Sequence, residues 1–234
     1  MEGDIKMQEG KKTVAVLYIE PTQAYLYGSN ITNYLLLKFP PDVVSDQEIV
    51  DLENFSKLFW EFFQQHQVTP SHILILLSTG LTFEKEFPDT LSSIDVDKDI
   101  KEFIDTVPFD EIVSNIYKLN KKEKVVAINK KLCDEILSIL GKLQFQVIAF
   151  VPESIAHEVV SELANNLDLS VLLSNADYLK QYSLLKTENT EMYKTTGKKK
   201  TEKKRLIFLG GVFFILLAIL MVLLIGNVPS NLRQ

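Results

Sequence analysis

The chain has few of the residues that build covalent cross-links or hold metals. Its 234 residues include one cysteine, Cys133, so neither an intramolecular disulfide nor a cysteine-rich zinc cage can form. The three histidines are His66, His72 and His157, and no two of them have the spacing of a metal-ligand pair. We therefore expect no metal site, and we expect Cys133 to be a small core residue rather than a nucleophile.

Glycine-rich phosphate loops are also missing. The sequence contains neither GxxxxGK[ST] nor GxGxxG, the two patterns whose backbone N–H groups cradle nucleotide phosphates. Acidic residues gather at Asp95, Asp97 and Asp99, but this is the expected start of a helix, where carboxylates complement the helix dipole. Because no catalytic constellation stands out, we expect a protein that is not an enzyme and needs no cofactor.

One long hydrophobic run is present near the C-terminus. It begins at Leu206 and ends at Ile225, and its 20 residues contain no charged side chain. A helix of this length, with a rise of about 1.5 Å per residue, covers about 30 Å, the hydrocarbon thickness of a bilayer. The sequence therefore predicts a transmembrane helix over 206–225, in contact with membrane lipid.

Basic residues directly before this run indicate its orientation. Residues 198–205 read KKKTEKKR and end on Lys203, Lys204 and Arg205, whereas the nine residues 226–234 contain one arginine. Lysine and arginine in short flanks mark the cytoplasmic side and also bind anionic headgroups. We therefore expect a single-pass membrane protein with its N-terminal domain in the cytoplasm, basic membrane-anchoring residues and a short external tail.

Before this basic segment the chain is acidic. Residues 1–197 carry 18 basic residues against 30 acidic residues. Such a balance disfavours binding to a phosphate backbone, so we expect no nucleic-acid partner. Residues 1–12 are predicted to be a polar tail. Residues 186–205 are rich in threonine, glutamate and lysine, which predicts a flexible basic linker between the domain and the hydrophobic run.

A first α/β lobe is predicted over 13–80. Short apolar runs rich in β-branched residues indicate strands, and these cover 13–19, 23–27, 31–39 and 72–77. The residues from Ser45 to Glu48 have the spacing of a capping box, which predicts a helix that continues to about His66.

A second group of elements follows along the chain. Apolar periodicity predicts strands over 81–87, 112–119, 124–129 and 144–150, helices over 95–106, 131–142 and 153–163, and a last strand over 169–173. These elements would form a second α/β group after the first lobe.

Aromatic residues crowd the predicted first helix, where residues 55–63 read FSKLFWEFF. In one interpretation these rings fill the core. In the other, Phe59, Trp60 and Phe63 bind a partner protein, because the rings are more numerous than one core face needs. An exposed sheet edge is a second candidate surface, because another protein can add a strand there.

The order of the segments resembles a known family. A three-stranded start, a helix, a strand ending in LLSTGLTFEKEFP and the segment KVVAINKKLCDEILSILGKLQFQVIAFVPES at 124–154 carry this resemblance. They are similar to the actin-like pilus-assembly protein PilM and to the cytoplasmic domain of its type II secretion counterpart, GspL, over about residues 12–175. The resemblance implies a partial actin-like (RNase H-like) lobe with an inserted small α/β subdomain, which here would cover 81–152, and a return to the first lobe over 153–185. With the predicted C-terminal transmembrane helix, the resemblance also implies that the membrane is the bacterial inner membrane.

The chain departs from that family where a nucleotide would bind. The family's first hairpin reads like IDIGSSSIK, and the matching stretch here is LYIEPTQAY, with Tyr18 in place of the aspartate and Glu20 in place of the glycine. A carboxylate repels phosphate, and a side chain blocks close backbone approach. We also expect no second actin-like lobe in a chain of this length, and therefore no nucleotide hydrolysis.

Three functions remain open on the sequence. The resemblance implies a non-enzymatic scaffold of a type IV pilus or type II secretion-like assembly platform, with other platform membrane proteins and a cytoplasmic motor ATPase as partners. A tail-anchored adaptor unrelated to pili and a membrane-tethered enzyme are the alternatives. The small residues Gly210, Gly211 and Ala218 also make a homodimer through the predicted span a candidate.

Overall fold

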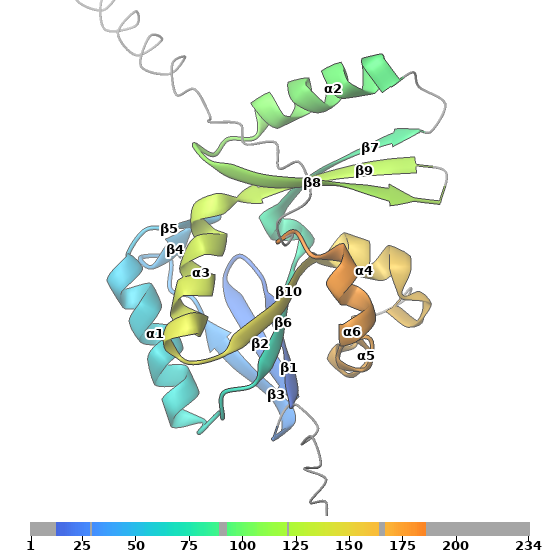
Figure 1. Ribbon diagram of the computed structural model, residues 1–234. Coiled ribbons are helices and arrows are strands. Elements are labelled where there is room, and N and C mark those ends of the chain that lie inside the picture. Colours follow the sequence, from blue (N-terminus) through green and yellow to red (C-terminus); the bar gives the residue numbers. More distant parts are fainter. Residues whose placement is uncertain (1–12, 29, 89–92, 121, 164–166, 186–234) are drawn as a thin grey trace, which may run out of the picture. The chain divides into compact units, whose positions relative to one another are not determined.

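A computed structural model describes residues 13–28, 30–88, 93–120, 122–163 and 167–185 (Figure 1). The main element of the fold is a five-stranded sheet with the strand order β10-β6-β1-β2-β3. Its strands are β1 (Val14–Ile19), β2 (Gln23–Gly28), β3 (Ile31–Lys38), β6 (His72–Leu77) and β10 (Gln146–Pro152). The pairs β1–β2 and β2–β3 are antiparallel, whereas the pairs β1–β6 and β6–β10 are parallel. The fold class is thus α/β with mixed strand pairing, and the strands predicted over 13–39 and 72–77 are confirmed.

Side chains of the inner strands alternate between two cores. Ala15, Leu17 and Ile19 of β1 face one core, and Val16 and Tyr18 face the other. All five are buried. A strand that is covered on both faces has no polar side, and for this reason β1 reads as a continuous apolar run.

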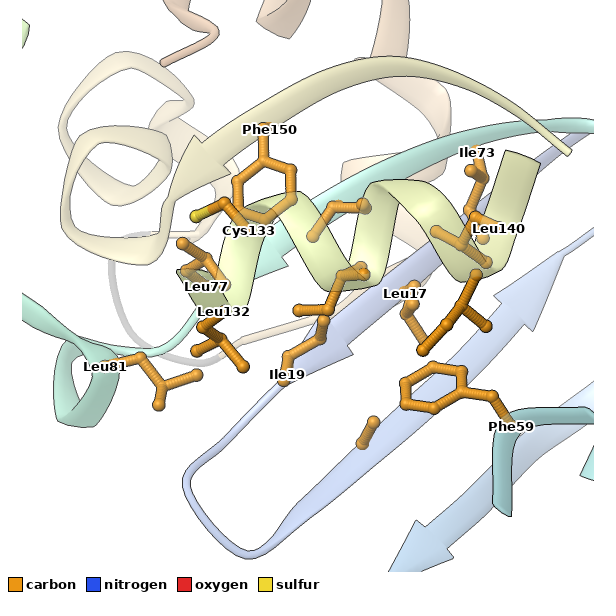
Figure 2. Packing of buried hydrophobic residues seen from close by; sticks show 14 of the residues in the cluster. Leu17, Ile19, Phe59, Ile73, Leu77, Leu81, Leu132, Cys133, Leu140 and Phe150 are labelled. Carbon is orange, nitrogen blue, oxygen red and sulfur yellow. The ribbon is translucent and has the colours of Figure 1, made fainter. Parts of the chain in front are cut away.

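Helices cover the two faces of this sheet (Figure 1). The first face packs against α1 (Leu52–Gln65) and α3 (Lys130–Lys142), and the second against α4 (Glu153–Val159), α5 (Leu169–Ser174) and α6 (Ala176–Leu179). Figure 2 shows the first core, where Leu132, Cys133 and Leu140 of α3 lie over Leu17 and Ile19 of β1.

A second, three-stranded sheet has its own small core. Its strand order is β7-β9-β8, formed by β7 (Thr82–Pro88), β9 (Lys122–Asn129) and β8 (Ile112–Leu119), with α2 (Ser93–Thr106) between β7 and β8 in sequence. Phe87, Ile104, Val125 and Ala127 are buried together there. The predicted strands and helix of this segment are confirmed.

The predicted capping box is wrong. Residues 45–48 belong instead to a tight hairpin between β4 (Val44–Ser45) and β5 (Glu48–Ile49), in which Asp46 and Gln47 have positive φ angles of 51° and 63°. Helix α1 begins after Asp51, whose carboxylate accepts a hydrogen bond from the Asn54 N–H at 3.0 Å. Both Ser45 and Asp51 are good N-cap residues, and the hairpin decides between them.

The strand predicted over 169–173 is also wrong, because these residues form helix α5. Asp168 caps this helix, since its carboxylate accepts a hydrogen bond from the Ser170 N–H at 2.8 Å. Leu172 is buried in the second core, so one apolar side of α5 packs against the sheet. The helix predicted over 153–163 is shorter than expected: α4 ends at Val159 and a 3₁₀ turn follows at Ser161–Leu163.

The boundary of the inserted segment differs from the predicted one. Strand β10 pairs with β6 in the five-stranded sheet, and α3 covers that same sheet, although both lie within the predicted insert 81–152. The separate sheet and its helix occupy 82–129. Apolar periodicity cannot report which sheet a strand joins, because it depends only on neighbouring residues in the chain.

The predicted tail, linker, span and external tail, at 1–12, 186–205, 206–225 and 226–234, lie outside the described residues. The same is true of the anchoring residues Lys203, Lys204, Arg205, Leu206 and Ile225. Among the helices that the structure describes, none is both long and apolar enough to cross a bilayer.

Candidate partner-binding site

Helix α1 separates the three predicted partner-binding aromatics. Phe59 and Phe63 are 0% and 3% exposed, whereas Trp60 is 56% exposed. The rings of Phe59 and Phe55 lie 5.0 Å apart, and those of Phe63 and Phe145 lie 4.7 Å apart. The prediction that Phe59 and Phe63 bind a partner is therefore corrected, because both rings fill the first core.

The helical repeat explains this separation. Residues at steps of three and four share one face of a helix, so Phe55, Phe59, Phe62 and Phe63 all turn to the sheet. Trp60 is about 100° around the helix axis from Phe59 and faces outward. Of the three candidates, Trp60 alone can contact another protein without opening the core.

Trp60 lines a groove between α1 and α3. The groove has a volume of about 610 Å³, and its walls come from both helices and from the loops that follow them. Its lining residues are Ser56, Lys57, Trp60, Gln64, Pro70, Ile139, Lys142, Leu143 and Gln144. A groove with an aromatic wall beside aliphatic side chains suits the apolar side chains of a protein segment.

Two of the residues that line this groove are lysines, Lys57 and Lys142, and none of the lining residues is acidic. Lys57 is exposed and its Nζ lies 3.8 Å from a Glu61 carboxylate oxygen, one helical turn away. Lys142 lies in the last turn of α3 and is also exposed. Lysines beside an apolar wall favour a partner segment that combines apolar and acidic side chains.

A second candidate region lies where the parallel strands β1, β6 and β10 end. In open α/β sheets, ligands commonly bind beyond the carboxyl ends of the strands. Here Glu153, directly after β10, accepts hydrogen bonds from the Tyr18 hydroxyl at 3.2 Å and from the Thr79 N–H at 3.1 Å. Burial, together with the carboxylates of Glu153 and Glu20, raises the pKa of the Tyr18 hydroxyl, so the phenol stays protonated and remains a donor.

The turn between β1 and β2 fills the space beside these groups. A Cβ atom added to Gly80 would lie 2.9 Å from Cγ of Pro21, so the proline ring rests against the Gly80 backbone. Glu20 follows β1 and accepts a hydrogen bond from Gln23 Nε2 at 2.6 Å. A phosphate placed here would meet two carboxylates and a proline ring, which is unfavourable both electrostatically and sterically.

An ion-pair cluster joins the small sheet to α4, and no local signal in the sequence identifies it. Lys124 of β9 is nearly buried, and its Nζ lies 2.6 Å from Glu158 of α4 and 3.1 Å from Glu86 of β7. Lys122 lies 2.9 Å from Glu86 and 3.0 Å from Glu158. Hydrogen bonds from Lys122 and Lys124 lower the pKa of Glu86. Glu84 of β7 also belongs to the cluster, at 3.7 Å from Lys124 Nζ. Each of these charged groups has a partner within the cluster, so its role is to hold β7 and β9 against α4.

The cysteine and the histidines have ordinary structural surroundings. Burial raises the pKa of the Cys133 thiol, which lies in the first core. His157 Nδ1 lies 2.7 Å from the Leu163 carbonyl oxygen, and His72 Nε2 lies 2.6 Å from Gln146 Oε1. Within the described ranges, no three histidine, cysteine or acidic side chains are grouped so that they could hold a metal ion.

No model of a protein family matches the chain, and no curated protein matches it. Among solved structures, the PilM–PilN type IV pilus biogenesis complex is similar, with a TM-score of 0.46 and 12% identity over 64% of this chain and 51% of that chain. The cytoplasmic domain of EpsL, an inner-membrane component of the type II secretion system of Vibrio cholerae, has a TM-score of 0.39 and 9% identity over 62% and 58%. A Bacteroides thetaiotaomicron protein with an actin-like ATPase fold and unknown function has a TM-score of 0.35 and 15% identity over 62% and 55%.

The first two of these structures are the two kinds of protein that the order of segments resembles. The chain spans between 51% and 58% of the length of these three solved chains.

Proposed function

We propose that this chain is a non-enzymatic scaffold that recruits partner proteins of a type IV pilus or type II secretion-like assembly platform to a membrane. The observation that carries the proposal is the groove beside Trp60, where a large aromatic side chain is exposed at the junction of two helices. Tryptophan in a groove is a typical anchor of protein–protein contacts. In this proposal the main sheet is a partial actin-like lobe and the small sheet is its inserted subdomain.

The proposed partners are other platform membrane proteins and a cytoplasmic motor ATPase. The chemistry of the groove narrows the contact to a segment that places an apolar side chain against Trp60 and Leu143 and acidic side chains near Lys57 and Lys142. Such charges favour the right partner and speed association more than they add to affinity.

The absence of enzymatic activity is part of the proposal and is supported by the carboxyl edge of the sheet. Glu20, Pro21 and Glu153 occupy the side on which a phosphate would have to approach. Isothermal titration of ATP and Mg²⁺ into the full chain should therefore give no saturable binding. Tight binding, or ATP hydrolysis that Glu153→Gln alters, would contradict the non-enzymatic role.

Membrane anchoring is proposed from the sequence. The uncharged run 206–225 and the basic segment 198–205 before it support a single span with the N-terminal domain in the cytoplasm. A tethered domain meets membrane partners at a high local concentration, so modest contacts suffice. Alkaline carbonate should leave the full chain in the membrane pellet and release a variant that lacks 206–225. Release of the full chain by carbonate would contradict the anchor.

The recruitment itself is tested by co-isolation from membranes of the native host. The full chain, a Trp60→Ala variant and a Tyr178→Ala variant are extracted in mild detergent, and the bound proteins are quantified by mass spectrometry. Tyr178 is the matched control, because it is also an exposed aromatic residue but lies on α6, away from the groove. We expect Trp60→Ala to lose pilus or secretion components that Tyr178→Ala retains. Equal retention by both variants, or enrichment of proteins outside such a platform, would contradict the proposal.

A further inference from the structure

The two edge strands of the five-stranded sheet, β10 and β3, differ in whether another part of the chain bonds to their outer side. At the outer side of β10, the Phe150 N–H donates to Ser183 Oγ at 3.0 Å and the Phe150 carbonyl oxygen accepts from the Leu184 N–H at 2.7 Å. The segment after α6 thus satisfies the N–H and C=O groups of Phe150 at that edge. On the opposite side the strand order ends at β3, and no strand in the described part of the chain pairs with its outer side.

The register of β3 shows which backbone groups face outward. The Phe39 N–H donates to the Thr22 carbonyl oxygen at 2.8 Å, and the register pairs Ala24 with Leu37. Antiparallel strands alternate between pairs that exchange hydrogen bonds and pairs whose N–H and C=O groups point away from each other. Two residues before Phe39, Leu37 therefore faces β2, and the N–H and C=O groups of Leu36 face the free edge.

The side chains of this edge do not protect it. Natural sheets guard free edges with charges, prolines or bulges. Residues 31–37 read ITNYLLL, so the first charge is Lys38 at the end of the strand. The register shift between β2 and β3 lies at Leu26 and Gly28, and the pairing of residues 35–38 is regular.

The edge strand β3 also carries exposed apolar side chains. Tyr34 is 62% exposed and Leu36 is 40% exposed. Tyr34 continues a row of rings across the sheet, because its ring lies 5.6 Å from that of Tyr25, which lies 6.0 Å from that of Tyr18. A strand added beside β3 would place alternate side chains against Tyr34 and Leu36 and extend this row.

We propose that the outer edge of β3 accepts an extended strand from another protein, with apolar side chains at alternate positions. Only an extended backbone can satisfy the outward N–H and C=O groups of Leu36, and apolar side chains on one face of that strand cover Tyr34 and Leu36. A second copy of the chain fits less well, because each copy carries 30 acidic against 18 basic residues before position 198. This surface is separate from the groove at Trp60 and does not depend on it.

A model peptide tests the backbone requirement directly. The probe is a fluorescent ten-residue peptide of alternating valine and threonine with a lysine at each end, and its control is the same peptide with N-methylated valines. Binding to the full chain in mild detergent is followed by anisotropy, and amide hydrogen exchange maps the protected residues. We expect saturable binding of the probe, protection within 31–38 and no binding of the N-methylated peptide.

Two variants at one position separate backbone from side chain. Leu36→Pro removes the outward N–H without breaking the pairing with β2, because proline is tolerated where an edge N–H faces solvent. It should weaken binding about tenfold, the effect of losing one backbone hydrogen bond and the fit around it. Leu36→Thr keeps the N–H and should bind within about threefold of the wild type, because the backbone contacts remain. Thermal unfolding of both variants checks that the fold is retained.

Several outcomes would overturn the proposal. They are equal binding of the methylated and unmethylated peptides, unchanged binding by Leu36→Pro, and the absence of saturable binding to the wild type. Binding that appears only after removal of residues 1–12 would show that the chain's own N-terminal segment occupies the edge. A dimer in sedimentation velocity that Leu36→Pro dissociates would assign the edge to a second copy.

Discussion

The edge at β10 and the edge at β3 show how one sheet can be closed on one side and open on the other. Ser183 and Leu184 satisfy the Phe150 backbone of β10, whereas Tyr34 and Leu36 are exposed on β3, whose outer side pairs with no strand among the described residues. Helix α1 repeats the contrast within one turn, since Phe59 is buried and its neighbour Trp60 is exposed. Stability should therefore depend on the closed positions, and partner binding on the open ones.

The largest effect on stability should come from a substitution on the buried face of α1. Phe59→Ala removes a fully buried ring from the first core, so the free energy of unfolding should fall by about 3–5 kcal/mol. Urea unfolding followed by circular dichroism measures this loss. A loss below about 1 kcal/mol would mean that the core around Phe59 is not packed as described.

A smaller effect is expected at the closed edge of the sheet. Leu184→Ala removes a side chain that is 2% exposed and packs in the first core, so the free energy of unfolding should fall by about 2–3 kcal/mol. Leu36→Ala at the open edge is the control, and it should cost below about 1 kcal/mol because Leu36 is already 40% exposed. An equal loss in the free energy of unfolding for the two variants would contradict the proposed difference between the two edges.

A pH series tests the ion-pair cluster that closes the small sheet onto α4. Lys122 and Lys124 lower the pKa of Glu86 from its ordinary value of 4.5. Because the folded-state pKa is the lower one, this stabilisation is complete above pH 4.5 and is lost as the pH falls through the folded-state pKa. Glu86 is half exposed, so solvent screening limits its contribution to below about 1 kcal/mol.

Unfolding of the wild type and of Glu86→Gln should therefore differ at pH 7, and the difference should shrink towards pH 3. Glu123→Gln is the matched control, since Glu123 lies on the neighbouring strand β9 of the same small sheet and pairs with the exposed Lys118 at 3.6 Å. A difference between wild type and Glu86→Gln that is the same at pH 7 and pH 3 would contradict the role assigned to these ion pairs.

The smallest effects on stability should come from the open positions. Trp60→Ala and Leu36→Thr each change an exposed side chain, so each should alter the free energy of unfolding by at most about 1 kcal/mol. Thermal and urea unfolding measure this. Trp60→Ala should nevertheless lose the co-isolated partners. If Trp60→Ala lowered the free energy of unfolding as much as Phe59→Ala does, Trp60 would have to be a core residue.

The sequence predicts elements well where a signal is local. The apolar runs of β1 and β6 predict strands that the structure confirms. It fails where two local signals compete, as at Ser45 and Asp51, or where an apolar run such as LSVLL suits a helix and a strand equally. There the choice depends on packing against distant parts of the chain.

The candidate site could be predicted only in part, for a similar reason. The dense aromatics of α1 mark the segment, but the exposure of Trp60 follows from the helical phase, which the core sets. The groove needs Ile139 of α3 and Leu143 directly after that helix, and the cluster around Lys124 needs Glu158. Contacts between residues so far apart in sequence leave no local pattern.

Site-specific cross-linking tests the recruitment role most directly. A photoreactive phenylalanine analogue at position 60 of the full chain, in native membranes, is compared with the same analogue at position 178. Position 60 should give a discrete cross-linked product that contains a pilus or secretion platform protein, and position 178 should not. Identical products at the two positions, or none at position 60, would contradict the docking of a partner in the groove between α1 and α3.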